Sequence, residues 1–152
     1  MRDNDGYDDE GFDDDDYEQE IGGTEYEQVL EQRHFDRFAA LSGDHNPIHV
    51  DPDYAAGTRF GATVSHGMLL FTAVRGLIAH SYPGAELESQ DLMFPNPAFA
   101  GEPLTVHLDI VAPPADDRLE LITRVENESR QVCLEGRCRL KLNRDANQEA
   151  RP

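Results

Sequence analysis

Two side chains capable of acid–base chemistry stand five residues apart in a segment that favours a loop. Asp44 and His49 flank Pro47 in the stretch Ser42-Gly43-Asp44-His45-Asn46-Pro47-Ile48-His49. A carboxylate and an imidazole held about one water molecule apart could take a proton from water and deliver one to carbon. This pair is therefore suited to adding water across a polarised double bond, with Asp44 as the base and His49 as its partner.

The second chemical feature is Gly67, where a strongly apolar stretch begins with helical character. The first N–H groups of a helix have no partner within the helix, and they carry a partial positive charge. Because glycine has no side chain, a carbonyl oxygen could approach the Gly67 N–H closely. The sequence therefore predicts donors for the negative charge that develops on a carbonyl oxygen when water adds to a polarised double bond.

Each of these residues also has a plain structural interpretation when it is taken alone. Asp44 could end a helix, Asn46 could form an Asx turn and His49 could be a hydrogen-bonded loop histidine. Their joint spacing favours the catalytic interpretation for Asp44 and His49. We expect Asn46 to orient the loop and His66 to be a structural residue at the helix start.

A metal site is the alternative use of the same side chains. Its candidate ligands would be Asp44, His45, His49 and His66. The usual arrangement of two histidines on one helical face requires a helix, which Pro47 disfavours at this point. We therefore predict neither a metal nor an organic cofactor.

The elements that must position these residues follow from the spacing of apolar side chains. A short helix is expected from Phe35 to Leu41, ended by Gly43, and a capped helical turn at 51–56. The stretch from Gly67 to Ala79 is apolar nearly all round, which predicts a wrapped helix. Alternating residues predict strands at 104–110, 119–125 and 132–142, and a further strand is expected at 22–30. An antiparallel sheet curled around one buried helix, an α+β fold, accounts for this order.

The chain is strongly acidic, with a formal charge of −18 over 152 residues. Residues 1–20 hold 11 acidic residues and one arginine and are expected to be a disordered acidic tail. The remainder still has 20 acidic and 12 basic residues, of which only Lys141 is lysine. This composition is typical of proteins from salt-saturated cytoplasm, although an ordinary acidic protein is the alternative.

The same charge argues against nucleic acid and anionic membranes as partners. No segment resembles a signal peptide or a membrane span, and we expect a cytoplasmic protein. Cys133 and Cys138 lie five apart on one predicted strand, so they should face opposite sides and remain unpaired thiols. We expect a single domain at 21–144, between the acidic tail and a frayed tail at 145–152.

The segment from Phe38 to Asp51, together with His66-Gly67-Met68, resembles the MaoC-type hot-dog family. The similarity is closest to its single-domain (R)-specific enoyl-CoA hydratases and runs from about residue 25 to residue 143. The resemblance implies a hot-dog fold, a homodimer and hydration of trans-2-enoyl-CoA to (R)-3-hydroxyacyl-CoA. Such a lyase would serve fatty acid metabolism or polyhydroxyalkanoate synthesis. Its catalytic positions fall on Asp44, His49 and Gly67.

Four further residues are candidates for binding the acyl-CoA substrate: Asn46, His66, Met68 and Arg75. Arg75 stands where the most similar hydratases carry a small polar residue, and it lies about two helical turns beyond Gly67. It is predicted either to pair with Glu88 or Asp91, or to shape the acyl site. His45 is a second departure, because an apolar residue is usual at that position.

Two other functions remain open from the sequence. Some hot-dog proteins are thioesterases, which hydrolyse the thioester and release a thiol. A non-catalytic acyl-CoA-binding or granule-associated subunit would lack a paired acid and base, whereas this chain has Asp44 and His49.

Overall fold

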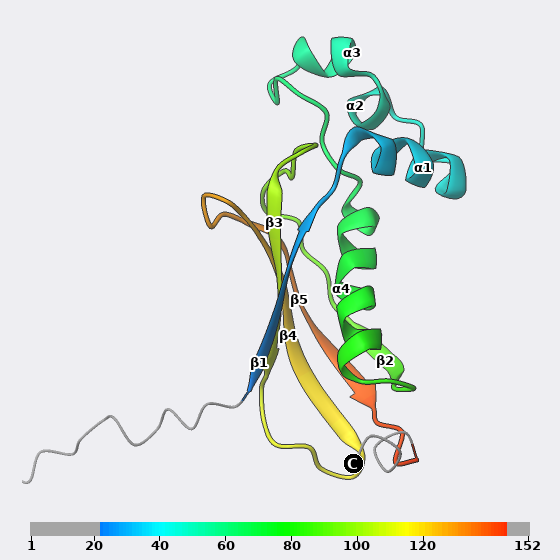
Figure 1. The fold of residues 1–152 in the computed structure, drawn as a ribbon, viewed down its shortest axis with the longest axis vertical. Coiled ribbons are helices and arrows are strands. Elements are labelled where there is room, and N and C mark those ends of the chain that lie inside the picture. The colour runs from blue at the N-terminus through cyan, green and yellow to red at the C-terminus, as the bar shows by residue number, and fades with distance from the viewer. Residues whose placement is uncertain (1–21, 146–152) are drawn as a thin grey trace, which may run out of the picture.

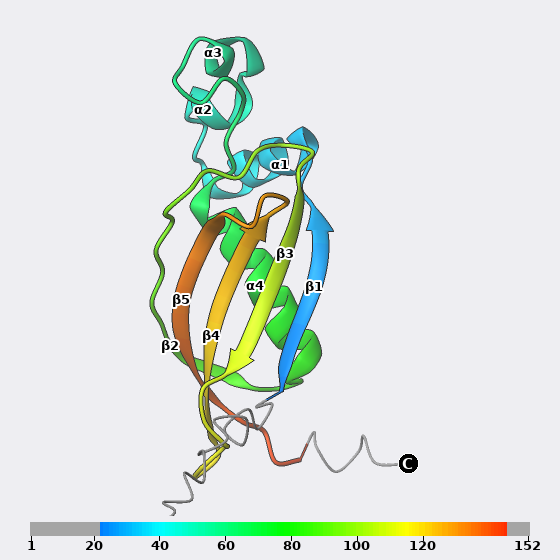
Figure 2. The ribbon, with the colours of Figure 1, turned by 90° about the vertical axis from the view of Figure 1, so that its left-hand side faces the viewer.

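A five-stranded antiparallel sheet forms the body of the computed structural model, which describes residues 22–145. The strands lie in the order β1-β3-β4-β5-β2. Their bounds are β1 Gly23–Val29, β2 Glu86–Gln90, β3 Pro103–Ile110, β4 Arg118–Asn127 and β5 Val132–Lys141. Helix α4, Gly67–Ser81, lies along one face of the sheet (Figure 1). Figure 2 shows the opposite face of the sheet, with α4 behind it.

The core lies between α4 and the face of the sheet that α4 covers, as the alternating pattern predicts. Every second residue of β4 is buried, namely Leu119, Leu121, Thr123, Val125 and Asn127. On α4 the buried residues are Leu69, Leu70, Val74, Leu77 and Ile78. The predicted strands at 104–110, 119–125 and 132–142 and the helix from Gly67 are thus confirmed.

The sheet packs against one side of α4, in keeping with the predicted fold class, and leaves the outer side of the helix uncovered in the single chain. Met68 is 50% exposed, and Thr72, Gly76 and Ala79 are also exposed along the outer face of the helix. The reason is the limited width of the sheet, whose first strand, β1, has mostly exposed side chains. An uncovered stripe of small and apolar residues therefore runs along α4.

Three shorter helices gather beyond the N-terminal end of α4 (Figure 1). They are α1, Gln32–Ser42, α2, Pro47–Val50, and α3, Pro52–Ala56. Helix α1 ends as predicted, because Gly43 adopts a left-handed conformation with φ of 80° and its N–H donates to the Ala39 carbonyl. The two candidate acid–base residues therefore lie in a small helical layer at one end of the sheet.

Helix α2 is a correction to the sequence interpretation, which treated Pro47 as a residue that disfavours helix here. Proline restricts the residue before it, and Asn46 indeed has a non-helical conformation. Pro47 itself takes the first helical position, where its missing N–H costs nothing. His49 consequently lies on a short helix rather than in an irregular loop.

Strand β2 was not predicted from the sequence. Its residues, Glu-Leu-Glu-Ser-Gln, are mostly polar, and only Leu87 and Gln90 are partly buried. It is an edge strand that pairs with β5 alone, with an irregularity between Leu87 and Ser89. An edge strand with little burial carries no alternating apolar signal.

The two cysteines correct another expectation, since both are buried in the core and do not face opposite sides of the sheet. A bulge accounts for this, because Val125 pairs with Leu134 while Glu126 pairs with Val132, leaving Cys133 as the extra residue. Both thiols are free. Burial raises the pKa of each to about 11, which keeps them protonated at neutral pH.

The predicted acidic tail at 1–20 lies outside the described residues, as do residues 146–152 of the predicted C-terminal tail. Within the described part, no helix is both long and apolar enough to cross a membrane.

Candidate active site

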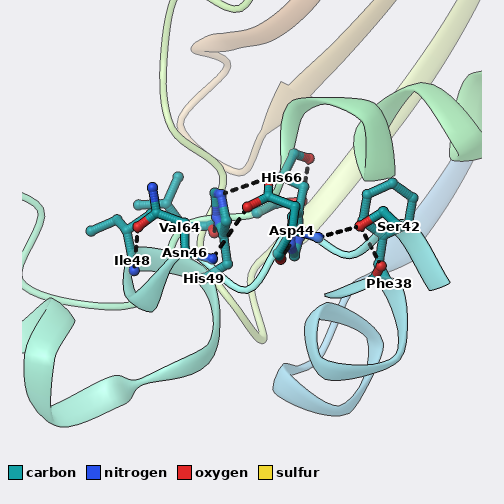
Figure 3. A network of polar contacts seen from close by, with 9 residues as sticks. Phe38, Ser42, Asp44, Asn46, Ile48, His49, Val64 and His66 are labelled. Carbon is teal, nitrogen blue, oxygen red and sulfur yellow. Dashed lines mark hydrogen bonds and ion pairs between the residues drawn. The ribbon is translucent and has the colours of Figure 1, made fainter. Parts of the chain in front are cut away.

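Asp44 projects from the turn that follows α1. Its backbone N–H donates to Ser42 Oγ at 3.2 Å, and its own Oδ1 accepts the Asn46 N–H at 3.2 Å (Figure 3). These bonds leave Oδ2 free of backbone donors. The side chain is 53% exposed, so the carboxylate remains open to solvent and to a ligand.

Asn46 caps helix α2 and so determines where His49 lies. Its Oδ1 accepts the Ile48 N–H at 3.2 Å. The His49 N–H donates in turn to the Asn46 carbonyl at 2.9 Å. Asn46 therefore positions the loop, as expected for an N-cap residue, and has its side-chain oxygen engaged with the backbone.

The His49 ring is held from one side by a backbone carbonyl. The distance from its Nδ1 to the Val64 oxygen is 2.6 Å, and because a carbonyl can only accept, Nδ1 carries the proton. The other nitrogen, Nε2, faces Asp44 Oδ2 at 3.7 Å. Both side chains thus point into the same gap, with the His49 side chain 15% exposed.

Gln32 at the start of α1 fixes the backbone of His49 and was missed by sequence reasoning. Its Nε2 donates to the His49 carbonyl at 2.8 Å, and its Oε1 accepts the Thr63 hydroxyl at 2.6 Å. No pattern in the sequence distinguishes this glutamine from a surface residue. The link becomes visible only when α1 and the segment before α4 are side by side.

His66 lies beneath the pair and is only 2% exposed. Its Nε2 donates to the Asp44 carbonyl at 2.9 Å. Its ring stacks on that of His49, with centroids 3.9 Å apart and planes at 27°. It also packs in a T-shaped arrangement with Phe38, whose ring centroid is 4.9 Å away. Burial lowers the pKa of His66 below its ordinary value, which favours a neutral ring.

Helix α4 begins at Gly67 directly after His66, and no side chain caps it. The N–H groups of Leu69 and Leu70 donate to the His66 carbonyl, whereas those of Gly67 and Met68 remain available as donors. A Cβ at Gly67 would lie 2.9 Å from Cζ of Phe94, so the bare glycine allows that ring to pack on the start of the helix. Sequence reasoning missed Phe94, which carries no motif.

A pocket of about 490 Å³ opens beside this helix start. Its lining includes Arg59, Phe60, Val64, Gly67, Phe94 and Asn96. Val64 connects the pocket to the acid–base pair, because its carbonyl is the oxygen that holds His49. Asp44, His49, His66 and Gly67 therefore lie in one neighbourhood, linked by the contacts of His66 with Asp44 and His49.

Two other candidate binding residues, Met68 and Arg75, do not line this pocket. Met68 is on the exposed side of α4. The expected pairing of Arg75 with Glu88 is wrong, because Glu88 pairs with Arg118. Arg75 Nη1 is buried without a hydrogen-bond partner among the described residues. Burial raises the pKa of Cys138, and the positive charge of Arg75 lowers it by a smaller amount.

The site also contains a cluster that could be considered for a metal ion. One ligand atom each from Asp44, His49 and His66 lie within 4.8 Å of one another. A nitrogen lone pair lies in the plane of its ring, and the stacked rings of His49 and His66 have nearly parallel planes. Zinc requires lone pairs that converge on a point about 2.0–2.1 Å from both nitrogens, which stacked rings do not favour. The geometry does not favour a metal centre.

Comparison with known proteins agrees with this architecture. A family model described as a MaoC like domain matches residues 17–130. The chain is 36% identical over 108 residues to an (R)-specific enoyl-CoA hydratase of Aeromonas caviae, covering 69% of this chain and 81% of that protein. It is 32% identical over 108 residues to a 3-hydroxybutyryl-CoA dehydratase of Methylorubrum extorquens, covering 69% and 68% of the two chains.

Among solved structures, an unliganded R-hydratase from Pseudomonas aeruginosa matches with a TM-score of 0.76 at 32% identity. The match covers 80% of this chain and 79% of that chain. The fold is therefore the predicted hot-dog fold, and the chain belongs to the MaoC-like family of hydratases and dehydratases.

Proposed function

We propose that this protein is an (R)-specific enoyl-CoA hydratase, which adds water to trans-2-enoyl-CoA to give (R)-3-hydroxyacyl-CoA. The observation that carries the proposal is the 3.7 Å gap between Asp44 Oδ2 and His49 Nε2. This gap is too long for a direct hydrogen bond, but a water molecule beside it could bond to both groups at about 2.8 Å. The hydratase and dehydratase relatives support the same chemistry.

In the proposed reaction, Asp44 is the base for the attacking water. The carboxylate takes one proton as the water oxygen bonds to C3, and the electron pair of the double bond moves toward the thioester carbonyl. The Gly67 N–H stabilises the negative charge on that carbonyl oxygen. Loss of such a donor typically costs about 10²–10³-fold in turnover.

His49 completes the addition by supplying the proton for C2. With Nδ1 bonded to the Val64 carbonyl, Nε2 is the nitrogen that exchanges protons. The imidazolium gives its Nε2 proton to C2 as the enolate collapses, and Asp44 then returns its proton to Nε2. The cycle leaves both groups in their starting forms, and dehydration is the same path in reverse.

Arg59, the one arginine that lines the pocket, could bind the phosphates of coenzyme A. Arg59 packs over the Phe60 ring at 4.7 Å, and no ion pair among the described residues includes it. A free cation beside the pocket suits the phosphates of coenzyme A in a chain of otherwise acidic character. Arg59→Gln should raise KM for crotonyl-CoA but not for crotonyl-pantetheine, whereas Arg139→Gln on β5 should change neither.

A homodimer would cover the exposed apolar residues around the site. Met68, Met93 and Phe94 are 50%, 60% and 43% exposed in the single chain. Large apolar side chains grouped in this way are typical of a protein–protein interface. Light scattering coupled to size-exclusion chromatography should give twice the chain mass, and a monomer mass under assay conditions would contradict this part of the proposal.

The proposed activity is tested by incubating the protein with crotonyl-CoA. A hydratase removes the absorbance of the conjugated enoyl thioester without releasing a thiol. Thiol release would support the thioesterase alternative. Binding without any chemical change would support a non-catalytic acyl-CoA-binding subunit.

A further inference from the structure

His66 touches both members of the acid–base pair and is covalently joined to the residue that supplies the carbonyl donor. Its Nε2–H donates to the Asp44 carbonyl and its ring stacks on His49 (Figure 3). Its own carbonyl carbon forms the peptide bond to Gly67. These three contacts involve the turn after α1, helix α2 and helix α4, which are separate parts of the fold. A single buried side chain thus connects the parts that the proposed reaction must hold in register.

The protonation of His66 follows from its partners. The Asp44 carbonyl can only accept, so Nε2 carries the proton and Nδ1 is left with a lone pair. That Nδ1 is buried and has no hydrogen-bond partner among the described residues. An apolar side chain would fill the same space without a buried unpaired atom, so packing alone does not account for a histidine here.

We propose that His66 is a positioning residue, which sets the distance and angle between Asp44, His49 and the Gly67 N–H without touching the substrate. This inference rests on the proposed hydratase function. Three observations carry it: the hydrogen bond to Asp44, the stacking on His49, and the 2% exposure that excludes the ring from solvent. It replaces both the substrate-binding role and the purely structural role expected from the sequence.

Neutrality of His66 is part of this role. The charged and titratable groups around the ring are Asp44, His45 and His49. A positive charge on a ring stacked 3.9 Å from His49 would oppose the imidazolium form of His49 that delivers the proton. Burial works in the required direction by disfavouring the charged form of His66.

The test compares two substitutions of His66 with a control at His45, the residue next to Asp44. His66→Leu removes the hydrogen bond and the aromatic face, and we expect kcat for crotonyl-CoA to fall about 100-fold, the effect of a displacement of roughly 1 Å. KM should change less than about threefold, since the ring does not contact substrate. His66→Gln can place an amide N–H where Nε2–H lies, so it should recover about tenfold of the lost kcat. His45→Gln, at an exposed neighbour, should leave both constants unchanged.

Equal losses in the leucine and glutamine variants would overturn the proposal, and so would a rise in KM at unchanged kcat, which would indicate substrate contact. A measurement on the wild-type protein covers the case in which the variants do not fold. Long-range proton–nitrogen NMR spectra of the imidazoles should show His66 as the neutral Nε2–H tautomer at pH 7. The Nδ1–H tautomer or a charged ring would contradict the proposal. If wild-type protein hydrates no enoyl thioester, the proposed function fails, while the NMR result still tests the geometry of His66.

Discussion

The two nitrogens of His49 have different partners: Nδ1 donates to the Val64 carbonyl at 2.6 Å, whereas Nε2 faces Asp44 Oδ2 at 3.7 Å. The first contact fixes the ring, and the second leaves space for a water molecule. Val64 also lines the pocket that contains Gly67. The Val64 carbonyl therefore fixes the position of His49 relative to the pocket in which a thioester could bind.

Replacing Asp44 by asparagine should abolish the base while preserving size and the turn. We expect kcat to fall at least about 100-fold with the protein still folded. His49→Ala should be similarly damaging, and the double variant should lose far less than the product of the two, because both groups act on one water molecule. Steady-state kinetics with circular dichroism as a folding control measures this. Fully multiplicative losses would mean that the two residues act independently.

Adding a methyl group at Gly67 should disturb the start of α4. A Cβ there would lie 2.9 Å from Cζ of Phe94, whereas a Cβ at Gly76 on the same helix meets nothing within 4 Å. We expect Gly67→Ala to displace the ring and lower kcat/KM by about tenfold or more. Gly76→Ala should leave activity intact and stabilise the helix by about 0.5–1 kcal/mol. Equal activities of the two variants would show that Phe94 moves away freely.

Shortening Arg75 should widen the range of acyl chains. If the arginine occupies space that longer acyl groups need, the wild type is limited to about C4 to C6, because each excluded methylene forfeits about 0.8 kcal/mol of burial. Arg75→Ser should then raise kcat/KM for octenoyl-CoA relative to crotonyl-CoA by about tenfold or more. Since Arg75 has no carboxylate partner in the described ion pairs, the substitution strands no buried charge. An unchanged ratio would remove Arg75 from the acyl site.

High salt should stabilise the protein if its acidity is an adaptation to salt. The formal charge of −18 creates self-repulsion, which salt screens. Thermal unfolding followed by circular dichroism should give a Tm that rises from low salt to molar KCl, and activity should rise with it. A flat or falling Tm would favour an ordinary acidic protein.

Sequence patterns predicted the elements whose burial is regular and missed those whose position depends on pairing. The alternation in β3 to β5 and the apolar helix α4 reflect burial against each other. Strand β2 has little burial and therefore no signal. The bulge at Cys133 depends on the register between two strands, which one strand's residues do not determine.

The residues of the candidate site also fall into those that the sequence indicates and those that only the tertiary structure reveals. Asp44, His49 and Gly67 were found because their types and spacing resemble a known family. Gln32 and Phe94 reach the site through the tertiary fold, from places in the chain with no motif. The predicted pairing of Arg75 with Glu88 is wrong for the same reason, because Glu88 contacts Arg118 only when β2 and β4 have taken their places in the sheet.

The most direct test of the acid–base assignment is the stereochemistry of crotonyl-CoA hydration in D2O. Because the proposed acid and base, His49 and Asp44, would act from one side, we predict that the hydroxyl group and deuterium add to the same face, giving one diastereomer of (R)-3-hydroxybutyryl-CoA. Chiral chromatography and the proton coupling between C2 and C3 measure both centres. Formation of the (S) product, or a mixture of deuterium configurations at C2, would contradict it.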